Sequence, residues 1–185
     1  MANALLVMAN GFEDIEAVAV IDVLRRGGVE IVTASLHDKR VVMSAHGIRM
    51  EADRLFADVA DATYDAIILP GGGEGTENLK RSESLAARLR RQKEEGRLLC
   101  AICAAPTVLV AAGVLAEKTV VTCYPTCQGE LDRAWSPSPV VADGTVITGQ
   151  APGSAVLFAL VVLQTLAGEQ VARKVAQGMV TDVLD

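Results

Sequence analysis

The sequence predicts an α/β sandwich with a mostly parallel sheet. Short apolar runs alternate with helical patterns along all 185 residues. Hydrophobic residues make up 51% of the chain but aromatic residues only 3%, so the core consists of Ala, Val, Leu and Ile, as in strands buried on both faces. Neither a repeat nor a low-complexity linker interrupts the chain, which predicts a single domain over residues 1–185.

The first half of the chain predicts three strands, a helix and a hairpin. The helix has apolar residues at helical spacing and ends at Gly27-Gly28, and Ala45-His46-Gly47 forms the predicted hairpin turn. The last strand enters three consecutive glycines, 71–73. In order, the elements are strand 4–8, helix 14–26, strand 30–35, hairpin strands 41–44 and 48–51, and strand 66–69.

The second half continues the alternation. Residues 98–116 carry no charge over 19 positions, but Pro106 and Gly113 interrupt this run, so a buried strand and a buried helix explain it better than a membrane span. Asp143-Gly144 predicts a hairpin turn. The elements are helix 83–95, strand 98–102, helix 105–112, strand 119–122, hairpin strands 140–142 and 145–148, helix 154–166, and a final helix from Glu169.

Charge and the N-terminal residues narrow the function classes. The net charge is −6 and the pI about 5.0, without a block of Lys and Arg, so we expect neither nucleic-acid nor membrane binding. Residues 1–14 lack a basic n-region and resemble a first strand more than a signal peptide, which predicts a cytoplasmic protein.

Four cysteines in such a chain are expected to be reduced thiols. Cys100 and Cys103 form CxxC, and Cys123 and Cys127 form CxxxC, which leaves a closed Cys₄ zinc site as an alternative. The first pair lies in an apolar run without the turn residues of a zinc knuckle, which disfavours that alternative.

Cys103 is the candidate nucleophile. Sites in parallel sheets form beyond the C-terminal ends of the strands, and Cys103 follows strand 98–102 directly. Ala101 and Ala105 flank it at two residues on either side, as a strand-to-helix nucleophile elbow requires. The helix that follows is expected to favour the thiolate. The alternative is a small buried cysteine at a tight turn.

Two further features converge on the same edge of the sheet. Gly71 and Gly72 follow a neighbouring strand and match neither phosphate-binding motif, so we expect an oxyanion pocket formed with the N–H of Ala104. Glu16 lies one turn into the first helix, where its carboxyl group could share a proton with the Cys103 thiolate. The two histidines are interpreted as surface residues.

Five stretches carry a family resemblance over nearly the whole chain. They are GFEDIEAV, DVLRRGGVEIVTAS, ILPGGGEGTENL, AICAAPTVL and ITGQAPGSAVLFAL, in this order. Together they resemble the ThiJ/PfpI superfamily, in the branch of the Parkinsonism-associated deglycase and bacterial YajL. The resemblance implies a flavodoxin-like three-layer sandwich of the class I glutamine amidotransferase type. It also implies that Cys103 is the reactive cysteine, Glu16 its buried acid partner, and Gly72 and Ala104 the backbone donors.

The resemblance implies a glyoxalase-III-like or deglycase enzyme with a role in oxidative and carbonyl stress. Its substrates would be methylglyoxal, glyoxal or their early adducts with protein thiols and amines. The family implies a homodimer that needs neither a metal nor an organic cofactor. The alternative is a redox-sensing stress protein or chaperone in which Cys103 is oxidised to the sulfinate and turns over little substrate.

Three positions depart from relatives within the superfamily. Ala104 stands where the PfpI-type protease branch has a histidine, so we expect no proteolysis. Tyr124 stands where several members have a histidine, and we place it in the substrate pocket with Gly71. Gln150 stands where the vertebrate proteins have an arginine, which weakens anion binding at the subunit edge.

Overall fold

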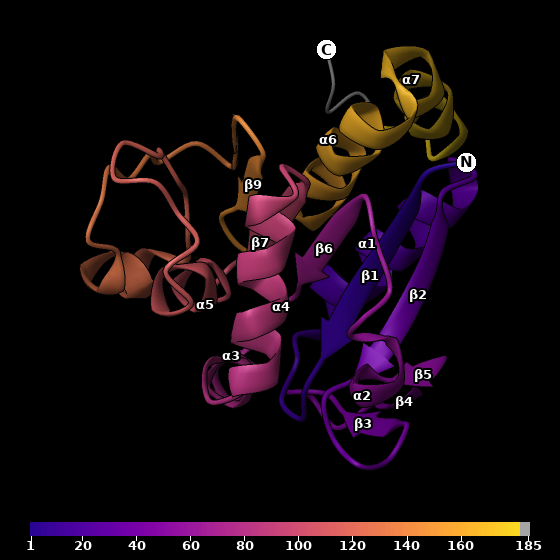
Figure 1. Cartoon of the computed structure of the whole chain (residues 1–185). Coiled ribbons are helices and arrows are strands. Elements are labelled where there is room, and N and C mark those ends of the chain that lie inside the picture. Colours follow the sequence, from indigo (N-terminus) through magenta and orange to yellow (C-terminus); the bar gives the residue numbers. More distant parts are fainter. Residues whose placement is uncertain (182–185) are drawn as a thin grey trace.

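A seven-stranded sheet forms the centre of the protein. The computed structural model describes residues 1–181, and its sheet has the strand order β5-β2-β1-β6-β7-β9-β8 (Figure 1). Every neighbouring pair is parallel except β8 and β9. The strands are β1 (Asn3–Met8), β2 (Glu30–Ser35), β5 (Arg54–Leu55), β6 (Ala66–Leu69), β7 (Leu98–Ile102), β8 (Val140–Asp143) and β9 (Val146–Gly149). β3 (Val41–Met43) and β4 (Arg49–Glu51) form a separate antiparallel hairpin.

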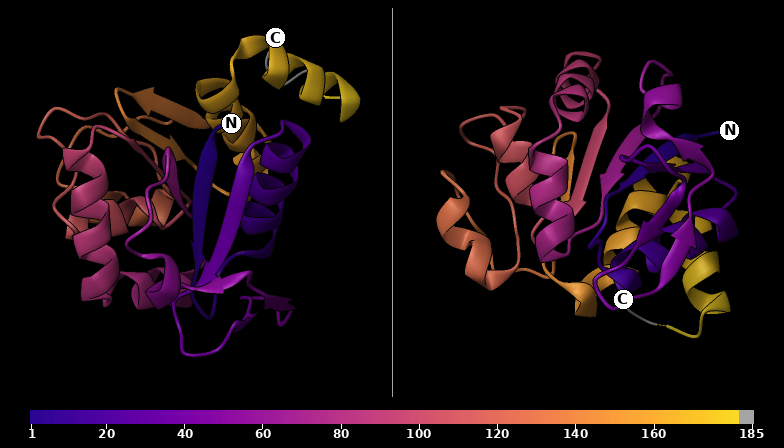
Figure 2. Two further views of the ribbon diagram at one scale, coloured as in Figure 1. Left: turned by 45° about the vertical axis from the view of Figure 1, so that its right-hand side comes forward. Right: turned by 90° about the horizontal axis from the view of Figure 1, so that it is seen from below.

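Helices cover both faces of the sheet (Figure 2). One face carries α1 (Asp14–Arg26), α6 (Ala155–Ala167) and α7 (Glu169–Gly178). The other carries α2 (Phe56–Val59), α3 (Gly73–Lys80), α4 (Glu83–Glu94) and α5 (Pro106–Ala111). Leu5 and Val7 of β1 contact the second group while Leu6 and Met8 contact the first, as the alternation of a strand requires. The three-layer α/β prediction is confirmed.

Helix α1 follows β1 and packs against the sheet as part of the core. The Glu13 side chain caps it by accepting a 2.8 Å hydrogen bond from the N–H of Glu16. Gly27 ends it, and a Cβ there would lie 2.2 Å from a methyl carbon of Leu163 in α6. Because α1 packs this closely against α6, the position of α1 is fixed, and so is the position of Glu16 on its buried side.

Two parts of the fold differ from the prediction. The predicted strand 119–122 is wrong: it forms only an isolated bridge between Val121 and Trp135. The N–H groups of Val120 and Thr122 bond to the side chains of Asp143 and Thr148 instead of a neighbouring strand. Helix α3, which begins in the glycine run, was not predicted, and neither were β5, α2 and the 3₁₀ turns η1 (Pro125–Glu130) and η2 (Pro152–Ser154).

The uncharged run at 98–116 forms β7 and α5, as predicted. None of the described helices combines the length and apolarity needed to span a membrane.

Candidate active site

The site lies where β1, β6 and β7 end side by side. β6 pairs with β1 through Ile68 and with β7 through Leu69, so the loops that follow these strands meet at one edge. These loops and the first turn of α1 bring together Cys103, Gly71, Gly72 and Glu16. The sequence placed these residues at this edge, and the structure brings them into contact.

Cys103 occupies a strained elbow. Its φ angle is +66°, in the left-handed region that non-glycine residues rarely adopt. The neighbouring chain holds it on both sides, because its N–H donates to Gly149 (2.9 Å) and its carbonyl accepts from the N–H of Tyr124 (2.7 Å). Only 8% of the residue is exposed. The strand–turn–helix arrangement predicted for this residue is present.

The two glycines allow the β6 loop to approach the elbow. A Cβ on Gly71 would lie 2.7 Å from the Cys103 Cβ and 2.8 Å from Glu16 Oε2. Gly72 has φ +93°, and a Cβ there would lie 2.1 Å from the carbonyl oxygen of Gly11. No larger residue fits at either position without moving the backbone.

Glu16 is fully buried beside the cysteine. The N–H of Gly71 donates to its Oε2 at 2.7 Å, while Oε1 is buried with no partner that meets hydrogen-bond geometry. Burial raises the pKa of this carboxyl group from 4.5 to about 7, although the Gly71 N–H and the Cys103 thiol act to lower it. The group therefore exchanges its proton near neutral pH.

The expected depression of the Cys103 pKa is wrong. Burial raises the pKa of the thiol, and the charge and hydrogen bonding of Glu16 raise it further, while the backbone N–H groups of Ala104 and Gly72 oppose the rise. Helix α5 begins only at Pro106, three residues after Cys103, and Pro106 has no N–H. Since the Glu16 charge raises the thiol pKa, the thiolate forms most readily when Glu16 holds the proton, and the two groups titrate as a pair.

The remaining candidate residues lie at the periphery. Tyr124 contacts the elbow through its backbone, while 42% of the residue is exposed. The Gln150 side chain donates to the carbonyl of Pro137 at 3.1 Å. Both histidines have other partners: His46 Nδ1 lies 2.7 Å from Asp14 Oδ2, and His37 Nε2 accepts from the N–H of Asn10 at 2.8 Å.

Potential metal ligands gather at one place in the described residues. Ligand atoms of Glu13, Asp14 and His46 lie within 4.8 Å of one another. The Asp14–His46 contact already pairs two of these three groups. The four cysteines, all free thiols, form no such group, which argues against the Cys₄ alternative.

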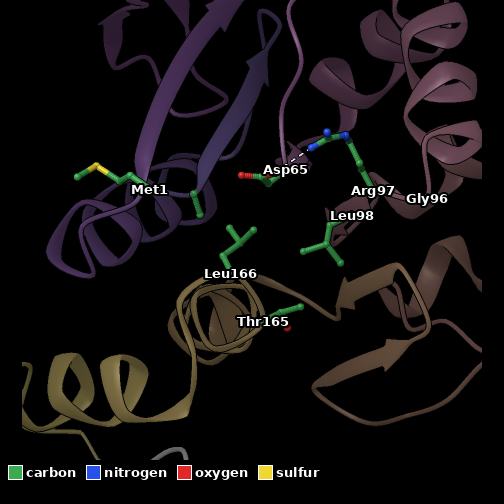
Figure 3. A pocket seen from close by; sticks show the side chains of 8 residues that line it. Met1, Asp65, Gly96, Arg97, Leu98, Thr165 and Leu166 are labelled. Carbon is green, nitrogen blue, oxygen red and sulfur yellow. Dashed lines mark hydrogen bonds and ion pairs between the residues drawn. The ribbon is translucent and has the colours of Figure 1, made fainter.

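A further cavity lies away from Cys103. It has a volume of about 580 Å³ and lies before β1, β6 and β7, between the Asp65–Arg97 ion pair and α6 (Figure 3). This is the N-terminal end of the parallel strands, opposite the end that carries Cys103.

Comparison with known proteins agrees with this geometry. The DJ-1/PfpI family profile matches residues 2–165. The chain is 37% identical to Protein dj-1beta of Drosophila melanogaster over 96% of both chains, and 37% identical to Glutathione-independent glyoxalase DJR-1.2 of Caenorhabditis elegans over 85% of this chain and 84% of that one. It is 38% identical to Protein DJ-1 homolog B of Arabidopsis thaliana over 96% of this chain, but spans only 41% of that longer protein.

The fold also matches a solved structure closely. Oxidized Toxoplasma gondii DJ-1 superposes with a TM-score of 0.94 at 35% identity, covering 98% of this chain and 100% of that chain. The match therefore extends over nearly the whole chain. The chain therefore belongs to the DJ-1/PfpI family.

Proposed function

We propose that this protein is a cofactor-independent glyoxalase that converts small α-oxoaldehydes such as methylglyoxal or glyoxal into hydroxy acids. The observation that carries the proposal is the buried contact between Cys103, in a strained elbow, and Glu16, whose pKa is raised to about 7. In this pair Glu16 can carry a proton near neutral pH, and Cys103 is the nucleophile, whose thiolate forms most readily while Glu16 holds the proton. The glyoxalase relative from C. elegans supports the assignment.

The reaction needs no external oxidant or reductant. The Cys103 sulfur adds to the aldehyde carbon, which forms a C–S bond and an alkoxide near the N–H groups of Ala104 and Gly72. Glu16 then moves the proton of that carbon to the neighbouring carbonyl carbon through an enediol, which leaves a thioester. Water breaks the C–S bond, so methylglyoxal plus water yields lactate and restores the thiol. One carbon is oxidised while its neighbour is reduced.

We further propose deglycase activity, in which the same site acts on early adducts of these aldehydes with proteins. Hemithioacetals and aminocarbinols, formed when methylglyoxal reacts with protein thiols and amines, release the same aldehyde carbon to a nucleophile. Since Cys103 is only 8% exposed, free aldehydes should reach it more readily than adducts on a folded protein.

A redox-sensing role is the second candidate. The N–H groups of Ala104 and Gly72 that act on the thiol could also hold the oxygens of a Cys103 sulfinate. A relative of this fold is known as an oxidized DJ-1. In this role Glu16 would donate a proton to the sulfinate and turnover would be low.

The proposed assembly is a homodimer. The exposed side of α1 presents Ile15 and Val18, which are 57% and 51% exposed, and together with Val156 and Met179 they line an apolar hollow of about 440 Å³. An apolar patch of this kind on a soluble domain commonly forms an interface. In a dimer with two-fold symmetry, the same face of a second copy of the chain would cover this hollow.

The direct test is consumption of methylglyoxal in a buffer free of Tris and thiols, both of which scavenge the aldehyde. We expect the wild-type protein to turn over and Cys103→Ser to lose activity by about two orders of magnitude or more. Cys127→Ser, which removes a more exposed thiol, is the matched control and should retain full activity. Equal rates for all three proteins would refute the proposal.

A further inference from the structure

Two of the four cysteines lie together outside the site around Cys103. Cys123 directly precedes Tyr124, and Cys127 lies in the first turn of η1. The carbonyl oxygen of Tyr124 accepts two hydrogen bonds, from the Cys123 Sγ–H at 3.3 Å and from the Cys127 N–H at 2.8 Å. One oxygen atom thus contacts the sulfur of the first cysteine and the backbone nitrogen of the second. The turn therefore brings the two residues close together.

Burial and charge connect the two thiols. Cys123 is fully buried and Cys127 is partly exposed, and both pack against the core on the face of the sheet that α2–α5 cover. Burial, followed by the charges of Cys127 and Glu130, raises the pKa of the Cys123 thiol to about 11. Burial also raises the pKa of Cys127. Both thiols are therefore uncharged at neutral pH, and the charge of one acts on the other.

A disulfide suits this environment better than a thiolate does. It carries no charge, so burial does not penalise it as it penalises an ionised sulfur. Reduction of a disulfide requires its sulfurs to leave as thiolates, and thiols with raised pKa values leave slowly. The hydrogen bond from Cys127 to Tyr124 already closes the turn, so joining the sulfurs needs little further ordering of the chain.

We propose that Cys123 and Cys127 form a second redox site, a dithiol that small disulfides of the glutathione type oxidise to an intramolecular disulfide. The sulfur of Cys127, the more exposed of the two, attacks the small disulfide and releases one small thiol. The sulfur of Cys123 then displaces the second small thiol from Cys127, which forms the S–S bond. The two protein thiols lose two electrons and two protons, and the small disulfide gains them as two thiols.

This proposal does not depend on the proposed enzyme activity. Neither Cys123 nor Cys127 belongs to the group formed by Cys103, Glu16 and the glycines after β6. The redox site can therefore be tested whether or not the protein is a glyoxalase.

The test is equilibration of the folded, reduced protein at pH 8 with an excess of oxidised glutathione. Free thiols are then blocked with iodoacetamide, and the protein is digested with trypsin without reductant for mass spectrometry. Cleavage after Lys118 and Arg133 gives one peptide, 119–133, that contains Cys123 and Cys127 and no other cysteine. We expect most of this peptide to carry no blocking group and to be lighter than the reduced peptide by two hydrogens.

Variants test the order of the two steps. Cys123→Ser should stop at the mixed disulfide of glutathione with Cys127, because the second thiol is missing. Cys127→Ser should leave Cys123 as a free thiol, because that sulfur is fully buried. Cys100→Ser, which removes an equally buried thiol elsewhere in the core, is the matched control and should form the Cys123–Cys127 disulfide as the wild type does.

Trp135 gives a second readout in the intact protein. It is the one tryptophan of the sequence, and its indole N–H acts on the Cys123 thiol and opposes the rise in its pKa. A neighbouring disulfide quenches tryptophan fluorescence. The emission of the wild type and of Cys100→Ser should therefore fall on oxidation and recover with dithiothreitol, while that of Cys127→Ser should not change.

Two results would overturn the proposal. The first is a wild-type peptide 119–133 that carries only blocked thiols or glutathione adducts after equilibration. The second is a disulfide that joins Cys123 or Cys127 to Cys100 or Cys103 in place of the expected bond.

Discussion

Replacing Glu16 by glutamine should stabilise the protein at and above neutral pH while removing its activity. Folding raises the pKa of this carboxyl group from 4.5 to about 7. Between these values the folded state binds more protons than the unfolded state, so wild-type stability falls as pH rises and becomes level above pH 7. At about 1.36 kcal/mol per pKa unit, the full loss is about 3 kcal/mol.

The substitution Glu16→Gln removes this pH-dependent loss of stability and changes the structure little. The side-chain oxygen of glutamine can still accept the hydrogen bond from the Gly71 N–H, and the side-chain volume is nearly unchanged. We therefore expect Glu16→Gln to match the wild type near pH 4.5 and to exceed it by about 3 kcal/mol at pH 8. Loss of the carboxylate charge should also speed alkylation of Cys103, because that charge raises the thiol pKa.

Urea unfolding between pH 4.5 and 9, followed by circular dichroism, measures this difference. Glu94→Gln, at an exposed position on α4, is the control and should follow the wild-type curve. Parallel curves for wild type and Glu16→Gln across this range would refute the reasoning, since they would mean that folding does not change the protonation of Glu16.

Three further predictions concern the elbow and the dimer. Gly71→Ala should lower activity about a hundredfold, because its Cβ would lie 2.7 Å from that of Cys103, and urea unfolding should give a loss of about 1–3 kcal/mol; wild-type kinetics would contradict this. Iodoacetamide at pH 8 should label Cys103 before Cys100 and Cys123 by peptide mapping, because those two thiols are fully buried while Cys103 is 8% exposed; earlier labelling of Cys100 or Cys123 would disprove the nucleophile assignment. Val18→Asp should convert a dimer into monomers in sedimentation equilibrium at micromolar concentration, whereas an unchanged mass would place the interface elsewhere.

The sequence allowed the sheet to be predicted well. Strands such as β1 and β6 are short apolar runs that are buried on both faces, so composition alone identifies them. Helix α3 escaped prediction because Gly73 and Gly75 are poor helix formers. Yet Gly75 must be small, since a Cβ there would lie 2.8 Å from the backbone nitrogen of Phe12. The close approach of Gly75 to Phe12 exists only in the folded chain, so no local sequence pattern predicts it.

The site was only partly predictable. The small residues around Cys103 and the glycines after β6 indicated the elbow and the close approach of a second loop. The pKa of the thiol was predicted in the wrong direction because it depends first on the burial of the thiol itself and then on the charge and hydrogen bonding of Glu16, and both arise only in the folded chain. Similarly, the sequence predicts a helix over 83–95 without indicating that Arg88 is buried, because that burial depends on the residues packed against the helix.

The central claim is that Cys103 and Glu16 act together to convert an α-oxoaldehyde into a hydroxy acid. It is tested most directly by ¹H NMR of methylglyoxal turnover in D₂O by wild type, Cys103→Ser and Glu16→Gln. The account predicts that the wild-type protein forms lactate with deuterium at C2, because Glu16 exchanges its proton with solvent, and that both variants form little or none. Lactate at the wild-type rate from either variant, or lactate that retains the substrate hydrogen at C2, would contradict it.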